Sequence, residues 1–230
     1  MKIISTKDNL DVLHEDNHII VINKRVGDIV QGDKTGDKPL SDVVKEYIKV
    51  KYDKPGEVFL GVVHRLDRPT SGIVAFAKTS KALTRMNELF KNRETKKTYW
   101  AVVKNKPAKP ADTLIHFLKR NEKNNSSKAH IKEVPDSKQA SLDYTIFKEL
   151  NNYFALEINL HTGRHHQIRA QLAAIGSPIK GDLKYGFDRS NADGGIHLHA
   201  RQLVFTHPVS KLELCIVAPV PNEVIWNAVK

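Results

Sequence analysis

Short apolar runs rich in β-branched residues recur along this 230-residue chain, and turn-forming residues bound them. We expect the run at residues 19–22 (IIVI) to form a buried strand. Similar runs predict strands at residues 73–77, 99–103, 141–147, 153–160, 202–205 and 212–217. Asn151-Asn152 and His207-Pro208 predict two hairpin turns. Because hairpins make neighbouring strands antiparallel, the pattern predicts an α+β fold with a mixed, mostly antiparallel sheet and flanking helices.

Apolar residues at helical spacing predict those flanking helices. Ser41 is expected as the N-cap of a helix whose apolar residues include Val44 and Ile48. Further helices are predicted after the strand at 73–77, over residues 167–175 and over residues 222–229. Residues 119–139 are polar and rich in turn formers, so we expect a surface excursion there and not a domain boundary.

The chain is basic, with a formal net charge of +11. Residues 78–109 hold ten Lys or Arg against two Glu, a local net of +8. Clustered cations favour a polyanionic partner such as RNA, although a solvated helix face would give the same pattern. Cys215 is the only cysteine, which excludes an intrachain disulfide and a thiolate zinc site. The sequence shows neither a signal peptide nor a membrane-spanning run, so we expect a cytoplasmic protein without a membrane partner.

The segment HRLDRPTSG at residues 64–72 is the densest in chemical groups. Pro69 and Gly72 predict a loop that enters the strand at 73–77. Asp67 lies between two arginines of this loop, which favour its ionised form and attract an anionic substrate. An ionised carboxylate can act as a nucleophile or a general base. A structural Arg–Asp ion pair in a solvated loop would explain the same residues without any catalysis.

A second such segment, LHTGRHHQIR at residues 160–169, runs from a strand end into a helix start. Backbone N–H groups at a helix start bind anions, and Arg164 and Arg169 add positive charge beside them. The loop at residues 176–186 follows and is bounded by glycines. Helix termination and ordinary turn chemistry would also account for this loop.

Five ordered blocks of the chain resemble the RluA family of pseudouridine synthases. Residues 64–72 resemble the family's catalytic motif. The stretch 162–169 with Gly176, Pro178, Gly181, Asp182 and Tyr185 resembles its C-terminal motif. Asn23-Lys24, Tyr99 before Ala101-Val102-Val103, and His199-Ala200 with Leu203 and His207-Pro208 are similar to the three remaining blocks. Arg25 departs from the family pattern, which commonly has proline there, and we expect no N-terminal RNA-binding module.

The resemblance implies an enzyme that isomerises uridine to pseudouridine in structured RNA. It implies one catalytic domain over residues 1–230, with two lobes around a basic cleft. Asp67 would be the essential carboxylate, Tyr99 would stack on the uracil, and Arg169 would pair with Asp67. The substrate would be ribosomal RNA, transfer RNA or both, and we expect a monomer. No metal and no organic cofactor are implied, because the substrate carries both bonding partners.

The resemblance also implies which residues contact the RNA. Arg65 would enter the helical stack and help to extrude the nucleotide, since a stacked and paired base is not accessible to chemistry. The further residues expected to bind RNA or assist base flipping are His64, Arg68, Lys78 and Arg164.

Two other classes of function are considered. A metal-dependent RNA hydrolase could use histidines 161, 165, 166, 197 and 199, but Gly163 interrupts the pair at 161 and 165, so these two do not lie on successive turns of one helix. A catalytically silent RNA-binding protein on the same fold is the other alternative. Release of tritium from carbon-5 of uracil distinguishes catalysis from binding, and chelation distinguishes a hydrolase from a synthase.

Overall fold

The computed structural model describes residues 4–33 and 35–230 as eleven strands and four α-helices. The strands are β1 (Val12–Glu15), β2 (Ile19–Lys24), β3 (Gly61–Val62), β4 (Ser71–Ala77), β5 (Lys96–Val103), β6 (Ala111–Asn121), β7 (Ser126–His130), β8 (Ser137–Glu149), β9 (Phe154–Leu160), β10 (Leu198–Thr206) and β11 (Glu213–Val217). The helices are α1 (Leu40–Lys51), α2 (Ser80–Lys91), α3 (Gln167–Ala174) and α4 (Val224–Val229), with a 3₁₀ turn at Leu183–Tyr185. The predicted α+β class with a mixed, mostly antiparallel sheet is confirmed.

Contacts divide the chain into two units. Unit 1 comprises Met1–Lys96 and Ala200–Pro221, and unit 2 comprises Lys97–His199 and Asn222–Lys230. The expected single catalytic domain over residues 1–230, with two lobes around a basic cleft, stays a prediction.

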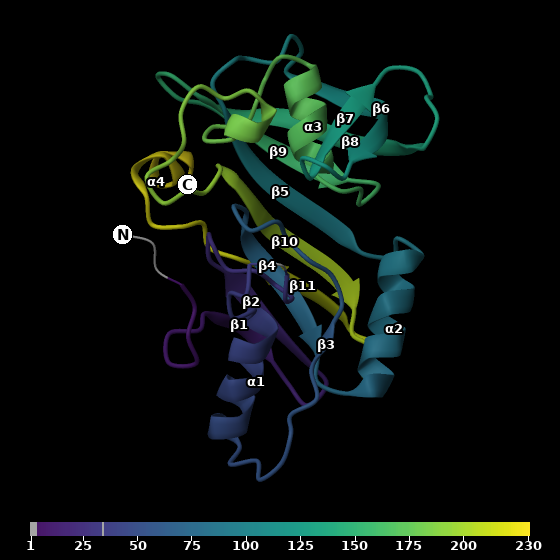
Figure 1. The fold of residues 1–230 in the computed structure, drawn as a ribbon, viewed down its shortest axis with the longest axis vertical. Coiled ribbons are helices and arrows are strands. Elements are labelled where there is room, and N and C mark those ends of the chain that lie inside the picture. The colour runs from purple at the N-terminus through teal and green to yellow at the C-terminus, as the bar shows by residue number, and fades with distance from the viewer. Residues whose placement is uncertain (1–3, 34) are drawn as a thin grey trace. The chain divides into compact units, whose positions relative to one another are not determined.

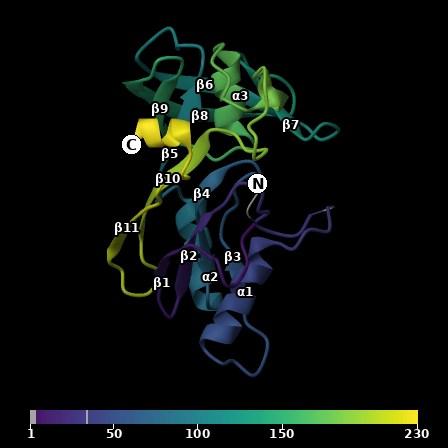
Figure 2. The same ribbon diagram turned by 90° about the vertical axis from the view of Figure 1, so that its left-hand side faces the viewer.

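Unit 1 is built on the strand order β1-β2-β4-β10, with β3 beside β4 and β11 beside β10. The predicted strand at 19–22 is fully buried, because both of its faces are covered. On one face, Val44 and Ile48 of α1 pack against Ile22 of β2 and Phe76 of β4. Figure 1 shows α1 against these strands, and the turned view in Figure 2 places it on the same face. Burying each such side chain stabilises the fold by about 1.5–3 kcal/mol.

The prediction of Ser41 as N-cap is wrong by two residues. The N-cap is Pro39, and Ser41 lies buried within the first turn of α1. Pro39 has an extended backbone (φ −75°, ψ 153°), which matches both the conformation of an N-cap and the fixed φ of proline. The orphan N–H groups of Leu40 and Ser41 donate to the carbonyls of Ile29 and Val30, so tertiary hydrogen bonds replace a side-chain cap.

Unit 2 contains the strand order β5-β9-β8-β6-β7. Helix α3 buries Ile168 and Leu172 against these strands, where they contact a core that includes Leu142, Tyr144 and Ile158. Figure 1 and Figure 2 both show α3 over this sheet. The predicted hairpin turn at residues 151–152 is confirmed by the hydrogen bond from the Leu150 N–H to the Tyr153 carbonyl.

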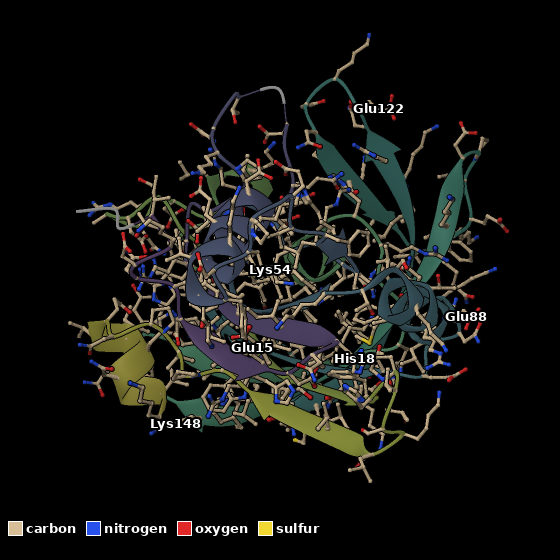
Figure 3. The ribbon with its side chains drawn as sticks, turned by 90° about the horizontal axis from the view of Figure 1, so that it is seen from below. Glu15, His18, Lys54, Glu88, Glu122 and Lys148 are labelled. Atoms are coloured by element: carbon tan, nitrogen blue, oxygen red, sulfur yellow. The ribbon has the colours of Figure 1, made fainter. Side chains whose placement is uncertain are left out.

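Strands β6 and β7 were not predicted, although they form much of the region 111–130. Only alternate residues of β6 are buried, including Leu114 and Leu118, so no continuous apolar run marks the strand. In β7 the two residues with this inward orientation are small, Ser127 and Ala129. Glu122 lies at the turn that joins the two strands, where Figure 3 labels it. Residues 119–139 are therefore largely a hairpin at the sheet edge.

Across residues 4–33 and 35–230, no helix combines the length and the apolar character that crossing a membrane requires.

Candidate active site

The segment 64–70 forms the predicted loop between β3 and β4 of unit 1. A turn closes it, in which the Thr70 N–H donates to the Asp67 carbonyl at 3.0 Å. Thr70 is buried, the Asp67 side chain is half-buried, and Arg65 is exposed. At the loop exit Gly72 has φ +110°, and a Cβ there would lie 2.4 Å from the Ala200 carbonyl oxygen. A Cβ at this position would be strained by the positive φ and would overlap the Ala200 backbone, which explains the glycine.

Lys24 holds the same loop through hydrogen bonds from its side chain. This lysine ends β2 with no exposed surface, and its ammonium donates to three backbone carbonyls. The acceptors are Arg25 at 2.9 Å, Arg68 at 3.2 Å and Thr70 at 2.7 Å. Burying an ammonium is unfavourable unless its donors are all satisfied, so these oxygens and the charge stabilise each other. Lys24, from the block Asn23-Lys24, thus holds the loop that carries Asp67.

Arg25, which stands where the family commonly has proline, makes hydrogen bonds that shape its loop. The backbone N–H of Arg25 donates to the buried carboxylate of Asp28 at 3.3 Å, a bond that proline could not make. The same carboxylate accepts from the N–H and the hydroxyl of Ser5 at 3.0 and 2.6 Å. The Arg25 guanidinium donates to the Asn9 carbonyl at 2.7 Å. Side-chain hydrogen bonds therefore shape the loop that proline commonly shapes.

His64 and Arg68, both expected to contact RNA, make contacts inside unit 1. His64 Nε2 accepts from the Ala75 N–H at 3.1 Å, and its ring stacks on Phe90 with centroids 4.8 Å apart. The Arg68 guanidinium donates to the Gly27 carbonyl at 3.2 Å and forms an ion pair with Asp37. These contacts join the Asp67 loop to its neighbours, and the RNA contacts of both residues stay predictions.

Lys78 also has partners within unit 1. Its ammonium donates to Glu15 at 2.8 Å and to the Asp16 carbonyl at 2.6 Å. Glu15, labelled on β1 in Figure 3, is nearly buried and also accepts from Lys51 at 2.7 Å and Tyr52 at 2.9 Å. Burial alone would raise the pKa of Glu15, but these hydrogen bonds outweigh it and lower the pKa from 4.5 to about 2. Lys78 is part of a structural ion-pair cluster, and its RNA contact stays a prediction.

The basic segment 78–109 runs from unit 1 into unit 2. Besides Lys78, several of its cations lie within 4 Å of an acidic side chain. These pairs include Lys104–Asp188 at 3.5 Å, Lys106–Glu149 at 2.6 Å and Lys109–Asp112 at 3.0 Å. The charge of these cations is therefore partly compensated within the protein, and the local net of +8 overstates the charge offered to a polyanion.

Tyr99 and Arg164 belong to unit 2. Tyr99 lies on β5 opposite Ile158 of β9, half-buried, and packs against the core of unit 2. Arg164 donates from Nε to the Gln139 carbonyl at 3.2 Å, and its backbone N–H donates to the Gln167 side chain at 3.0 Å. The predicted passage from a strand end into a helix start is confirmed.

Arg169, on the first turn of α3, is buried and held by a carboxylate. Its Nε and Nη2 atoms donate to the two oxygens of Asp182 at 2.7 and 2.8 Å. Its Nη1 atom donates to His166 Nε2 at 3.1 Å, and its guanidinium lies over the ring of Tyr185, 5.0 Å from the centroid. Sequence reasoning placed Asp182 and Tyr185 in a motif without giving them a role. Their place in that motif and in the glycine-bounded loop was the available signal.

The histidines considered for a metal site have other partners. His161 Nε2 lies 2.7 Å from Asp143, and His165 Nδ1 lies 2.9 Å from the Ser127 hydroxyl. His197 Nε2 lies 3.0 Å from Glu223, which caps α4. In the described part of the chain, no group of three or more His, Cys, Asp or Glu residues is arranged to hold a metal ion.

Comparison with known proteins identifies the family. A family model described as RNA pseudouridylate synthase matches residues 18–174. The ribosomal large subunit pseudouridine synthase D of Xylella fastidiosa is 34% identical over 228 residues, covering 93% of this chain and 67% of that protein. The enzyme of the same name from Escherichia coli K12 is 31% identical over 236 residues, covering 94% and 68%. The solved structure of human RNA pseudouridylate synthase domain containing 4 is 25% identical, with a TM-score of 0.78 over 92% of this chain and 89% of that one.

The fold and these matches define an RNA-modifying isomerase. The chain belongs to the RNA pseudouridylate synthase family, so the predicted membership and the predicted RNA pseudouridine synthase activity are confirmed. None of these matches favours a catalytically silent RNA-binding protein.

Proposed function

We propose that this enzyme isomerises uridine in the RNA of the large ribosomal subunit, with Asp67 as its catalytic carboxylate. The similarity to two bacterial enzymes named ribosomal large subunit pseudouridine synthase D supports this substrate. The observation that carries the role of Asp67 is the way its loop is fixed: the buried ammonium of Lys24 and the close approach at Gly72 hold the backbone that directly follows Asp67. A carboxylate that is already held in the reactive orientation raises the rate of the chemical step, because that orientation does not have to be reached during the reaction.

The proposed reaction is an isomerisation in which atoms balance within the nucleotide. Asp67 either attacks C1′ or removes the proton on the neighbouring C2′, and the bond from C1′ to N1 of uracil breaks. In the first case the ester bond between Asp67 and C1′ breaks when the new carbon–carbon bond forms, and in the second the proton returns to C2′ at that step. The detached uracil rotates and its C5 forms the new bond to C1′. N1 gains a proton and C5 loses one. No metal or organic cofactor is needed in this scheme, because the substrate supplies both bonding partners.

Tyr99 and Arg169 complete the proposed site. The ring of Tyr99 would stack on the uracil and hold it while it is detached. Arg169 would pair with Asp67 and fix its rotamer and its charge. The hydrogen bonds to Asp182 and His166 support this role, because they orient the guanidinium within unit 2.

Arg65 is proposed to help extrude the target nucleotide. Its exposure on the Asp67 loop supports this role, since an extruding side chain must reach the stack. Arg164, at the start of the motif that carries Arg169, is the second proposed RNA contact. His64, Arg68 and Lys78 are proposed to contribute to RNA binding as well. We also propose transfer RNA as a further substrate, a monomeric state and a cytoplasmic location.

The test uses RNA labelled with tritium at C5 of uracil. Wild-type enzyme should release tritium from large-subunit ribosomal RNA, and Asp67→Asn should release only the background amount while keeping its melting temperature and its RNA affinity. Turnover by Asp67→Asn would overturn the assignment of the carboxylate. Release from transfer RNA but not from ribosomal RNA would overturn the proposed substrate.

A further inference from the structure

The guanidinium of Arg169 is held more firmly than a single ion pair would require. Arg169 is 5% exposed and Asp182 1% exposed, so the pair lies in the protein interior. The two hydrogen bonds between them, at 2.7 and 2.8 Å, use Nε and one N–H of Nη2. A bidentate pair of this kind fixes the plane of the guanidinium as well as its position.

His166 holds the guanidinium from another side. Its Nε2 lies 3.1 Å from Arg169 Nη1. Because arginine can only donate, His166 Nε2 must be the acceptor, and the ring proton therefore sits on Nδ1 and is donated to the Tyr185 hydroxyl at 2.9 Å. His166 is the N-cap of α3 with a left-handed backbone, φ 52° and ψ 27°. That conformation is unfavourable for a residue with a Cβ, so the surrounding contacts must maintain it.

Tyr185 extends this arrangement to the β6–β7 hairpin. Its hydroxyl accepts from the Ser127 N–H of β7 at 2.8 Å, while its ring faces the Arg169 guanidinium. The hydroxyl of Ser127 lies 2.9 Å from His165 Nδ1, and the His165 ring stacks on His166 with centroids 3.8 Å apart. Ser127 is thus joined to the histidine pair by two routes.

We propose that Asp182 is a positioning residue of the isomerisation, and that His166 and Tyr185 assist it by holding the Arg169 guanidinium in one orientation. Arginine has five N–H groups, and the three bonds described here use one on Nε, one on Nη1 and one on Nη2. These bonds fix both the position and the plane of the guanidinium within unit 2. This inference rests on the proposed function, in which Arg169 pairs with Asp67.

The test is a double-mutant cycle on the turnover number. Asp182→Asn keeps the shape of the side chain but removes its charge and one acceptor, so we expect kcat to fall about 100-fold, as for a misplacement of about 1 Å, with KM for RNA changed less than threefold. Arg169→Lys should lose at least as much. If Asp182 acts through Arg169, the double variant will be no slower than Arg169→Lys alone. Multiplying losses would overturn the proposal, because they would show that Asp182 acts independently.

Asp188→Asn is the matched control. Asp188 lies six residues further along the chain, is largely exposed and pairs only loosely with Lys104 at 3.5 Å. We expect its kcat and its melting temperature to match those of the wild type.

Tyr185→Phe keeps the proposal testable if Asp182→Asn does not fold. It removes only the hydroxyl that joins His166 to Ser127, and we expect kcat to fall about tenfold with KM unchanged. An unchanged kcat would overturn the part of the proposal that concerns the hairpin. The Nε–H signal of Arg169 in ¹⁵N NMR gives a readout without substrate: slow solvent exchange in wild type and fast exchange in Asp182→Asn are expected. This readout stays informative even if Asp67 is not the catalytic carboxylate.

Discussion

Replacing Lys24 by Met tests whether the buried ammonium holds the Asp67 loop. Methionine has nearly the length of lysine and fills the same space without a donor. The substitution therefore removes the three hydrogen bonds to the carbonyls of Arg25, Arg68 and Thr70 and leaves packing nearly unchanged. We expect both the free energy of unfolding and the turnover number to fall.

The magnitude follows from two opposing terms. A hydrogen bond to a charged group contributes about 1.5–3 kcal/mol, and a buried carbonyl that loses its donor costs about 1–3 kcal/mol. Removing the ammonium also removes its own desolvation penalty of several kcal/mol, which offsets part of the loss. The net expectation is a destabilisation of about 3 kcal/mol, or a melting temperature lower by roughly 6–12 °C for a chain of this size. A loosened loop should lower kcat about 10- to 100-fold.

Urea titration and tritium release measure these two effects separately. Lys81→Met is the control, because Lys81 is an exposed lysine on α2 and its replacement should change stability by less than about 0.5 kcal/mol. If Lys24→Met unfolds within 1 kcal/mol of the wild type and keeps its kcat, the ammonium does not hold the loop and the reasoning is refuted.

Three further outcomes are expected. Gly72→Ala should destabilise the fold by about 3–5 kcal/mol in urea titration, because a Cβ would strain a φ of +110° and meet the Ala200 carbonyl; a loss below 1 kcal/mol would contradict this. Glu15→Gln should lower the free energy of unfolding by about 2–3 kcal/mol at pH 7. Since the pKa of Glu15 in the folded protein is lowered to about 2, this difference from wild type should shrink as the pH falls from 4.5 towards 2. A difference that stays constant down to pH 2 would contradict this. Arg65→Ala should lower kcat/KM about tenfold more on a structured RNA than on an open loop, and equal losses would argue against extrusion.

The strands that the sequence revealed are those with continuous apolar runs. The run at 19–22 is buried on both faces, so every residue in it is apolar and local pattern suffices. Strand β7 has one buried face, occupied by Ser127 and Ala129, and the reason for those small residues is tertiary: Ser127 must approach Tyr185 and His165. A pattern search that looks for apolar residues therefore misses this strand.

The motifs that carry the candidate site are visible in the sequence, but the contacts that hold their side chains are not. The motif around Asp67 is contiguous, and its residues Pro69 and Gly72 predict the loop from the local sequence alone. The partners of Lys24 lie 44 and 46 residues away, and Asp182 lies 13 residues from Arg169. Neither pairing leaves a local pattern, because any buried oxygen of suitable geometry could serve as the partner. The sequence likewise gave no sign that Lys78 donates to Glu15, a residue 63 positions away in the chain.

The block Asn23-Lys24 and the C-terminal motif each place a cation in the protein interior, and this lowers the free-energy cost of binding RNA. Lys24 and Arg169 are buried, and each is stabilised only while a particular set of oxygen or nitrogen acceptors stays in place. The loops that supply those acceptors are therefore ordered before substrate arrives. Ordering a residue's backbone costs about 1–2 kcal/mol, so a loop of six residues fixed only on binding would consume roughly 6–12 kcal/mol of the interaction with RNA. Because folding has already met this cost, the energy of the phosphate contacts remains available to unstack the uridine, which needs about a few kcal/mol.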